Sequence, residues 1–455
     1  MKKTCLFLSL LGLVLFLGCN KEKELNPEKV LKGNPFLTSV KVAGARKVSI
    51  DTTANQIQII LPEQFKGDVI DIELGISEDA ALELHPWRPL FSPGHVKYHF
   101  RGSPPEHFTL SKKSGSGAHT KTYAVFVKHE GPLSAELTSD IVLTPSSPTN
   151  ARGAGTIVLK SGIGSIPEAP NEVTKVVPFI KNTAKNIDIQ GNWDLGTISF
   201  EDVFSLMDVD GSIVGLQYGD KTFQFPQMQK LGRGPVTVHF YYADRLFRVF
   251  KKGMPTDFYG GIFLHSNTYS VALQNGRLAS PVKLPLKTIG ISGLQTQFPS
   301  SLPDDQYLLS FYEGTQLIGN APLVIARDTL ARAIGQMWVE ESEDQKTYLQ
   351  FRSDPITLIR GSQLLANPFP IIADHASQPF DKTKKIPDLA LRKNEKITIL
   401  KARVKEDPTY ADHSIRLYIG AYRIPTDMPP GRYDAMMVLG ESQYSLPYWS
   451  QIEIR

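Results

Sequence analysis

The chain has 455 residues, of which 41% are hydrophobic, and its formal net charge is +4 at neutral pH. This length suits two to four domains, and the near-balanced charge excludes the basic field that binding to nucleic acid requires. Its 35 glycines and 32 prolines are spread along the sequence, as frequent turns between short strands require. The composition therefore predicts a globular all-β protein.

Residues 1–18 are predicted to be a signal peptide. A positive start, Met1-Lys2-Lys3, precedes an apolar run, Cys5–Leu17. That run is too short to cross the hydrocarbon of a bilayer, which takes about 20 residues, and it has the length of a signal-peptide core. It ends in Phe16-Leu17-Gly18-Cys19, which resembles the lipobox of bacterial lipoproteins, with Phe16 in place of the usual leucine. The resemblance implies cleavage before Cys19 and attachment of palmitate-type acyl chains to it, enough for a stable membrane anchor.

Residues 19–35 are predicted to be the lipidated tether. Asn20-Lys21-Glu22-Lys23-Glu24 is charged and solvated, and it also resembles the export signal that follows the lipidated cysteine in surface lipoproteins of the Bacteroidota. This resemblance implies an outer-membrane protein that faces the cell exterior, with the periplasmic face as the alternative. Because Cys5 leaves with the signal peptide, Cys19 is the one cysteine of the mature chain, which excludes an internal disulfide and a cysteine nucleophile.

Residues 36–131 are predicted to form an immunoglobulin-like β-sandwich. Apolar and polar residues alternate in Val69–Leu74 and in Tyr123–Val127, which is the pattern of strands with one buried face. The segment resembles the N-terminal immunoglobulin-like modules of Bacteroidota surface lipoproteins, which end in a Tyr-x-Val-x-Val strand. Here that strand is Tyr123-Ala124-Val125-Phe126-Val127.

Residues 132–327 are predicted to form a second β domain, either single or composite. A short helix is expected at Phe200–Met207, because Phe200, Val203, Phe204 and Met207 would share one helical face. Ser199 and Asp202 stand at the spacing of a capping box before it.

Residues 328–455 are predicted to form a C-terminal immunoglobulin-like β-sandwich related to the second domain. Phe298–Tyr307 matches Ile424–Tyr433 at an offset of 126 residues, and both copies read as a proline-containing turn into a strand. The motif resembles the start of the penultimate strand in the immunoglobulin-like and IPT-like domains of these lipoproteins. Asp305 replaces Gly431 in the first copy, so the two turns must differ.

The sequence contains none of the hydrolase, zinc-protease or phosphate-loop motifs that we sought, so no catalytic residue and no cofactor are predicted. His95 and His99 are the best-spaced candidate metal ligands. They lie in an alternating run, where residues four apart are about 13 Å from each other, too far for one zinc ion. No metal site is predicted, and no particular pair of carboxylates suggests a glycosidase.

Three aromatic residues are candidate ligand-binding residues, because sugar rings stack on indole and phenol faces. Trp87 stands between two prolines, and Trp193 and Tyr259 have turn-like neighbours, so all three are expected on loops. Trp338 and Trp449 lie in or beside strands and are expected to pack in the core.

Two classes of function remain. The leading hypothesis is a non-enzymatic surface lipoprotein that binds a polysaccharide or host glycan as an accessory to outer-membrane uptake, held by its lipid anchor and partnered by an importer or another surface protein. The alternative is an adhesin or structural assembly subunit, with the loop aromatics as anchors of protein contacts. A hydrolase is a third and more remote hypothesis.

Overall fold

The computed structural model describes residues 28–84, 91–114, 117–226, 229, 231–240, 247–339, 355–407 and 415–455. The signal peptide, Cys19 and Trp87 lie outside these ranges, so the expectations about them stay predictions. The described chain is built of short strands in several sheets, which confirms the all-β fold class. Among the described residues, no helix is long and apolar enough to span a membrane.

The chain divides into two compact units. One contains Met1–Leu143 and Arg152–Gly232, and the other contains Thr144–Ala151 and Arg233–Arg455. The segment 132–327 therefore contributes to both units, with residues 132–143 and 152–232 in the first and residues 144–151 and 233–327 in the second. The physical reason is that its two parts form separate sheets, each with its own set of pairing partners.

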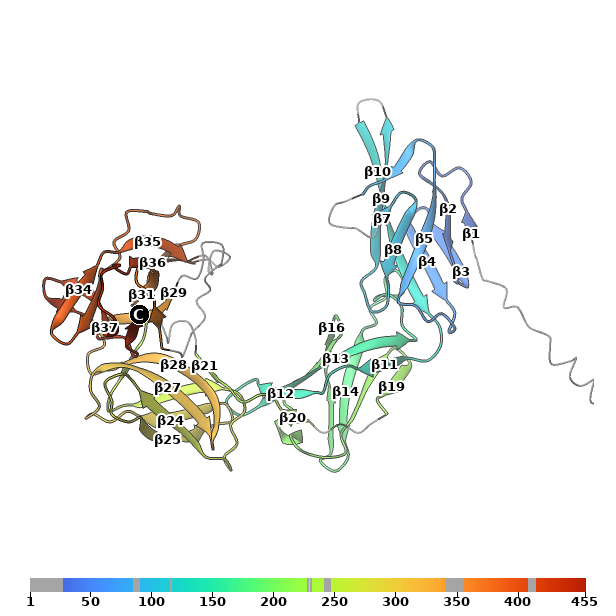
Figure 1. Cartoon of the computed structure of the whole chain (residues 1–455). Coiled ribbons are helices and arrows are strands. Elements are labelled where there is room, and N and C mark those ends of the chain that lie inside the picture. Colours follow the sequence, from blue (N-terminus) through green and yellow to red (C-terminus); the bar gives the residue numbers. More distant parts are fainter. Residues whose placement is uncertain are drawn as a thin grey trace, which may run out of the picture. The chain divides into compact units, whose positions relative to one another are not determined.

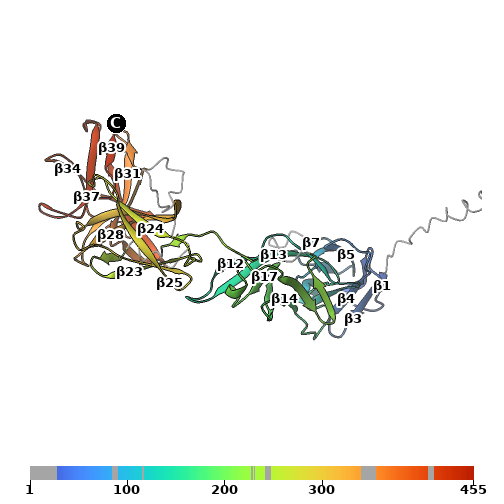
Figure 2. The same ribbon diagram turned by 90° about the horizontal axis from the view of Figure 1, so that it is seen from below.

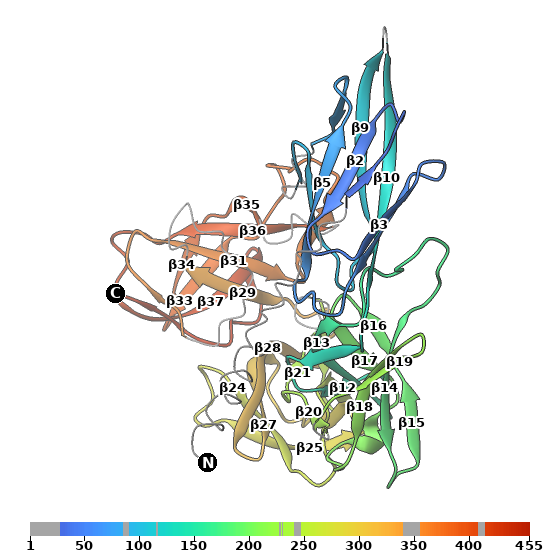
Figure 3. The same cartoon turned by 90° about the vertical axis from the view of Figure 1, so that its right-hand side faces the viewer.

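The first unit begins with a β-sandwich of two five-stranded sheets. One sheet has the order β1 (Glu28–Val30), β2 (Leu37–Val42), β5 (Val69–Ile76), β8 (His95–His99), β7 (Phe91–Ser92), and the other has the order β3 (Lys47–Asp51), β4 (Gln56–Leu61), β10 (Gly117–His129), β9 (Glu106–Ser114), β6 (Ala80–Leu82). Strands β9 and β10 form a long hairpin that extends beyond the rest of the sandwich (Figure 3).

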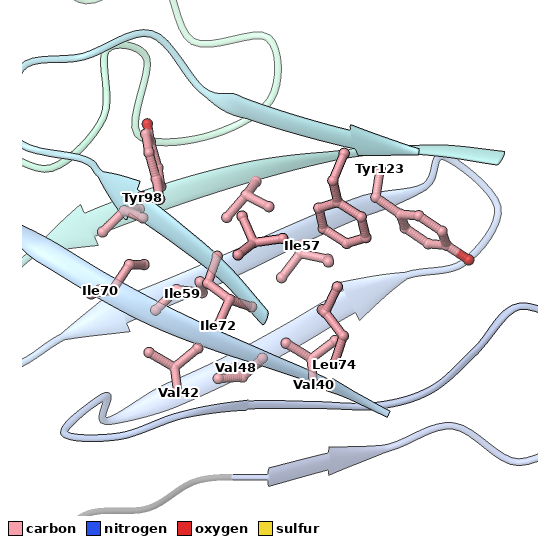
Figure 4. Packing of buried hydrophobic residues seen from close by; sticks show 14 of the residues in the cluster. Val40, Val42, Val48, Ile57, Ile59, Ile70, Ile72, Leu74, Tyr98 and Tyr123 are labelled. Atoms are coloured by element: carbon pink, nitrogen blue, oxygen red, sulfur yellow. The ribbon is translucent and has the colours of Figure 1, made fainter. Parts of the chain in front are cut away.

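The core of this sandwich confirms the alternation in the sequence. Ile70, Ile72 and Leu74 of β5 are buried, whereas Asp71 and Glu73 between them are exposed. Figure 4 shows these three side chains facing Ile57 and Ile59 of β4 and Tyr123 of β10 across the core. Burial of alternate residues on two facing sheets is what a period of two dictates.

The tether is shorter than predicted, because residues 28–30 already belong to the sandwich. Strand β1 pairs with β2, with Glu28 opposite Lys41 and Val30 opposite Ser39. All three β1 side chains are exposed, so only the backbone holds this strand. A polar sequence without buried side chains gives no alternation from which a strand could be predicted.

The first unit continues with a second β-sandwich. One sheet has the order β16 (Asn192–Asp194), β17 (Thr197–Phe200), β13 (Ala151–Ser161), β12 (Val142–Pro145), β20 (Gly232–Arg233), with β11 (Ser134–Leu137) also paired to β13, and the other has the order β15 (Ile187–Gln190), β14 (Val176–Asn182), β18 (Ile213–Tyr218), β19 (Lys221–Gln224). In Figure 1, β11 and β19 are drawn on the same side of this sandwich.

The prediction of a helix at Phe200–Met207 is wrong. Phe200 ends strand β17, and the helical part is a single 3-10 turn at Phe204–Leu206. Asp202 and Asp208 on either side have positive φ angles of 58° and 57°, which an α-helix of L-residues cannot pass through. Phe200, Val203 and Leu206 are buried, so apolar residues of this irregular segment pack in the core.

The two sandwiches of the first unit are joined through hydrogen bonds between loops. The backbone N–H of Gly102 donates to the carbonyl of Gly164 at 2.8 Å, and that of Ile166 donates to the carbonyl of Ser103 at 2.8 Å. The hydroxyl of Ser165 accepts from the backbone N–H of Val127 at 2.9 Å, so the segment after β13 also binds the last strand of the first sandwich. Because this joint uses buried backbone groups, we expect it to be stiff.

The second unit begins with a sheet that closes around one aromatic-rich core, as a third sandwich. Its order is β21 (Val238–His239), β23 (Pro255–Gly260), β26 (Gly293–Gln297), β25 (Val282–Ile289), β24 (Tyr269–Gln274), β27 (Asp305–Glu313), β28 (Gln316–Ala326), β22 (Val249–Lys251). Phe258 of β23 packs with its ring centroid 4.8 Å from that of Phe311 of β27, which joins the two halves of the sheet.

The second unit ends with a fourth sandwich. One sheet has the order β29 (Ala333–Val339), β31 (Gln363–Phe369), β36 (Ile415–Arg423), β32 (Ile372–His375), with β35 (Arg403–Asp407) also paired to β36, and the other has the order β30 (Thr357–Leu358), β39 (Ile452–Ile454), β37 (Gly431–Gly440), β33 (Leu389–Lys393), β34 (Lys396–Leu400), with β38 (Gln443–Tyr444) also paired to β37. Trp338 and Trp449 are both buried here, which confirms that they pack.

The sequence repeat is a repeat of structure. Tyr307 at the start of β27 donates its hydroxyl hydrogen to the carbonyl of Pro303 at 2.9 Å, and Tyr433 in β37 donates to that of Pro429 at 2.5 Å. Both tyrosines are buried, and each bonds to a carbonyl four residues earlier. This geometry resembles the tyrosine corner of immunoglobulin-like sandwiches, where such a bond fixes the turn into a central strand.

Asp305, where the repeat has glycine in its other copy, joins the third and fourth sandwiches. Arg277 binds the Asp305 carboxylate with two hydrogen bonds of 2.7 Å and donates to the carbonyl of Tyr448 in the fourth sandwich at 3.1 Å. Next to it, Gln306 accepts from the backbone N–H of Trp449 at 3.1 Å. The departure from the repeat that the sequence showed is therefore a contact between domains.

Candidate functional site

Tyr259 is the candidate that the structure leaves open to a ligand. It lies on strand β23 instead of a loop, because Asp257 and Tyr259 point outward while Thr256 and Phe258 point into the core of the third sandwich. Its side chain is 47% exposed, a large fraction for a tyrosine on a paired strand. Of its turn-like neighbours, Gly260 is the last residue of the strand and Gly261 follows it.

Tyr259 has cross-strand neighbours on both sides. Across the strand pairs, Tyr259 stands opposite His239 of β21 on one side and Gly293 of β26 on the other (Figure 2 shows β23 and β25 of this sandwich). Directly opposed residues on paired strands share one face and lie about 5 Å apart. The side chain of Ile289, which is opposed to Gly293 on β25, covers this glycine, because a Cβ added at Gly293 would meet it at 2.5 Å.

A row of polar side chains follows one step along the same face. The side-chain amide of Gln295 donates to the Asp257 carboxylate at 2.8 Å, and these two residues are directly opposed on β23 and β26. Lys287 of β25 is opposed to Gln295 and exposed, so it completes the row. We call Tyr259, His239, Asp257, Gln295 and Lys287 the Tyr259 face. It offers a ring, hydrogen-bond donors and hydrogen-bond acceptors on a rigid sheet.

Trp193 lies in a different environment. It is half-buried on β16, and a side chain added at Gly102 would meet its ring at 3.1 Å and Leu159 at 2.8 Å. The ring therefore covers the turn at Gly102 in the first sandwich, whose backbone hydrogen-bonds to the second sandwich. Its indole N–H has no hydrogen-bond partner among the described residues. Trp193 belongs to the first unit and Tyr259 to the second, so neither unit brings the two together.

The acidic clusters of the second unit are saturated with hydrogen bonds. The Glu313 carboxylate accepts from Arg233 at 2.9 and 3.1 Å, from Asn267 at 2.6 Å and from Tyr269 at 2.8 Å. Burial alone would raise the pKa of Glu313, but these donors outweigh it and lower the pKa below its ordinary value. Burial and the bond to Glu313 raise the pKa of Tyr269 to about 12. Such a carboxylate is held in place by its donors and joins the loops around it.

The described residues contain no group of three His, Cys, Asp or Glu side chains that could hold a metal ion. His95 points to the outer face of β8, where its Nδ1 lies 3.0 Å from the Asp71 carboxylate. The same strand also carries His99 on its outer face.

Of the five residues of the Tyr259 face, only Tyr259 was predicted from the sequence. Alternation within Pro255–Gly260 could have placed Asp257 beside Tyr259, because they are two residues apart in a strand. No local signal could have placed His239, Gln295 and Lys287 there, since each comes from a different strand of the sheet.

The fold defines the class of protein: a chain of tandem immunoglobulin-like β-sandwiches. No family model and no curated protein matches the sequence. Solved structures with a similar fold include the Bacteroides ovatus mixed-linkage glucan utilization locus protein SGBP-B in complex with a mixed-linkage heptasaccharide, at 10% identity over 80% of this chain and 93% of that one, with a TM-score of 0.22.

Two further structures are the FN1–FN3 domains of chicken CNTN1 and a tetra-tandem repeat from the extending region of a large adhesion protein. The first has 11% identity over 71% of this chain and 98% of that one, with a TM-score of 0.19. The second has 12% identity over 87% and 97%, with a TM-score of 0.17. These similarities concern the fold alone.

Proposed function

We propose that this chain is a non-enzymatic surface lipoprotein that binds a polysaccharide through the Tyr259 face. The observation that carries the proposal is an exposed tyrosine on a paired strand, next to a row of polar side chains on the same face. A sugar ring stacked on the phenol would have the Ile289 side chain, which covers Gly293, as an apolar neighbour.

The polar row supplies the remaining contacts that a sugar needs. The Asp257 carboxylate has an oxygen beyond the one that Gln295 binds, and this oxygen can accept from a sugar hydroxyl. Gln295 and Lys287 can donate to sugar oxygens. Adjacent strands are about 4.8 Å apart, which is close to the length of one sugar unit, so a chain lying across the strands would meet one row of side chains per unit.

Binding without catalysis is supported by the state of the buried acids. Glu313 and Asp305, two largely buried carboxylates of the second unit, make structural bonds with Arg233 and Arg277. The Tyr259 face contains one carboxylate, whereas hydrolysis of a glycosidic bond generally uses two.

The test is binding of a polysaccharide panel by the Cys19→Ala chain, measured by affinity electrophoresis and calorimetry. Tyr259→Ala is expected to weaken binding roughly 10- to 100-fold, since burying an aromatic side chain contributes about 1.5–3 kcal/mol. The matched control is Leu317→Ala, which removes a 49% exposed apolar side chain from β28 of the same sandwich. Equal affinities for Tyr259→Ala and the unaltered face would refute the proposal.

The location is proposed from the lipobox and the tether sequence. Labelled palmitate is expected to enter the wild-type chain and not the Cys19→Ala variant, which should also leave the membrane fraction. Protease added to intact cells is expected to remove the chain if it faces the exterior. Resistance in intact cells, with cleavage after the outer membrane is permeabilised, would indicate the periplasmic alternative.

A further inference from the structure

The second sandwich has an open strand edge. Strand β11 pairs with β13 and with no other strand among the described residues, and β19 pairs only with β18 there. A groove of about 550 Å³ runs along β11, and its lining includes the six consecutive residues 135–140. The opposite wall contains Phe225, Pro226 and Gln229, which follow β19.

The backbone along this groove is ready for another strand. The N–H of Thr138 donates inward to Thr156 of β13 at 2.8 Å. Because hydrogen-bonding groups alternate between the two sides of an antiparallel strand, those of Leu137 and Ala135 point outward, toward the groove. Neither residue has a backbone hydrogen bond on that side to any described residue. A row of outward N–H and C=O groups is a template for strand pairing.

The other three sandwiches each pair an early strand of their own chain with a late one. In each, an early strand lies parallel to a late one: β4 with β10, β22 with β28, and β30 with β39. In the second sandwich, β12 follows β11 and pairs with β13 and β20 instead. The tip of the β12–β13 hairpin, Thr144–Ala151, belongs to the other compact unit. Strand β12, which follows β11, is thus paired within its own sheet and does not cover the outer edge of β11.

We propose that the groove binds an extended peptide segment of a partner protein, which adds to β11 as a strand. The occupant must be a polypeptide, because only a peptide backbone matches the spacing of outward groups on a strand. Six residues span about 20 Å. Phe225 and Pro226 offer an apolar wall for one side chain of the segment.

Charge specifies the segment further. Glu136 is paired with Lys160 at 2.8 Å, whereas Asp140 at the end of the groove makes no ion pair with a described residue. The segment should therefore alternate apolar and polar residues and carry a lysine or arginine near Asp140.

The test is selection of random eight-residue peptides on the Cys19→Ala chain. Enriched peptides are expected to alternate, to carry a basic residue and to slow amide exchange in residues 133–140. Leu137→Pro removes one outward N–H and is expected to weaken binding about 3- to 10-fold, the effect of losing one hydrogen bond. Proline is tolerated on an edge strand when its missing N–H faced outward. Asp140→Asn tests the charge without touching the backbone and should weaken binding about 2- to 5-fold.

Three results would overturn the proposal. One is the absence of any enriched peptide whose binding depends on Leu137 or Asp140. Another is protection of residues 133–140 that disappears when residues 20–27 are removed, because the tether would then be the occupant. The third is a dimer that Leu137→Pro dissociates, because a second copy would then fill the groove. Retained binding to polysaccharide by both variants separates this result from failure of the Tyr259 face.

Discussion

His129 is held in one neutral tautomer at the joint between the first two sandwiches. Its Nδ1 accepts from the backbone N–H of Gly162 at 3.1 Å, so the hydrogen sits on Nε2, which donates to the carbonyl of Phe65 at 2.9 Å. Burial lowers the pKa of His129 below its ordinary value of 6.5. A proton on Nδ1 would face the Gly162 N–H, and Lys221, which donates to the His129 carbonyl, adds positive charge nearby.

This geometry predicts that acid weakens the joint. Below pH 6.5 the unfolded chain binds a proton at His129 while the folded chain does not, until the pH reaches the lowered folded pKa. The free energy of unfolding of the first unit should therefore fall, by up to about 1.4 kcal/mol per pH unit in this window. Urea denaturation at pH 7.5, 6.5 and 5.5 measures the slope.

His129→Asn is the control, because an amide keeps an acceptor for Gly162 without titrating. Its slope should be smaller than that of the wild type. Buried Glu168 works in the opposite direction, since burial raises its pKa and protonation then favours the folded state in a lower pH range. An equal slope in the wild type and in His129→Asn would contradict the prediction.

At the scale of the element, the turn between β16 and β17 uses an unfavourable residue. Leu195 has a φ of 40° and Gly196 a φ of 90°, so two successive residues are left-handed. Hairpins with this turn prefer Asn-Gly, because leucine in that region is strained. The Leu195 side chain is 77% exposed, so packing does not compensate for the strain.

Leu195→Asn is therefore expected to stabilise the second sandwich by about 0.5–1 kcal/mol. Thermal denaturation followed by circular dichroism measures the change. Asn186 provides the reciprocal control, because it is an exposed asparagine with a φ of 52° in the turn before β15. Asn186→Leu should destabilise by a similar amount, and a loss of stability in Leu195→Asn would show that the leucine has a packing role.

At the scale of the whole molecule, the third and fourth sandwiches are coupled by the Asp305–Arg277 pair. Both side chains are largely buried, and Arg277 also holds the carbonyl of Tyr448. Asp305→Ala leaves the largely buried Arg277 with only the more distant Asp434 carboxylate, at 3.7 Å, as an ion-pair partner, which costs about 3 kcal/mol. We expect denaturant unfolding of this variant to show a loss of that size and the two sandwiches to unfold separately.

Glu453→Gln is the matched control, because it breaks the exposed pair of Glu453 with Arg455 in the same unit. Surface pairs contribute about 0–1 kcal/mol, so this variant should unfold as the wild type does. In Arg277→Met with Asp305→Ala, part of the lost stability should return, since no buried charge remains unpaired. A single unchanged transition in Asp305→Ala would argue that apolar contacts alone hold the joint.

The amino-acid sequence was sufficient to predict the all-β fold, the alternating strands such as Val69–Leu74, and the repeat that carries Tyr307 and Tyr433. These features follow from side chains two residues apart or from a copied motif, so local chemistry suffices. Prediction from the sequence failed where backbone conformation or strand pairing, and not the side-chain pattern, set the structure. Where a helix was predicted, Asp202 and Asp208 have left-handed backbone conformations on either side of a single 3-10 turn. Strand β1 is held by backbone pairing alone, because its side chains are all exposed.

The residues that come together in the candidate sites could be identified only from the folded sheets. Tyr259 could be named from the sequence, but its neighbours come from strands β21, β25 and β26, which register and sheet order bring to one face. The open edge of β11 is likewise a property of what pairs with it. Strand pairing joins residues far apart in the chain through backbone groups that every residue carries, so the sequence pattern specifies which residues face outward, and the sheet specifies which of them meet.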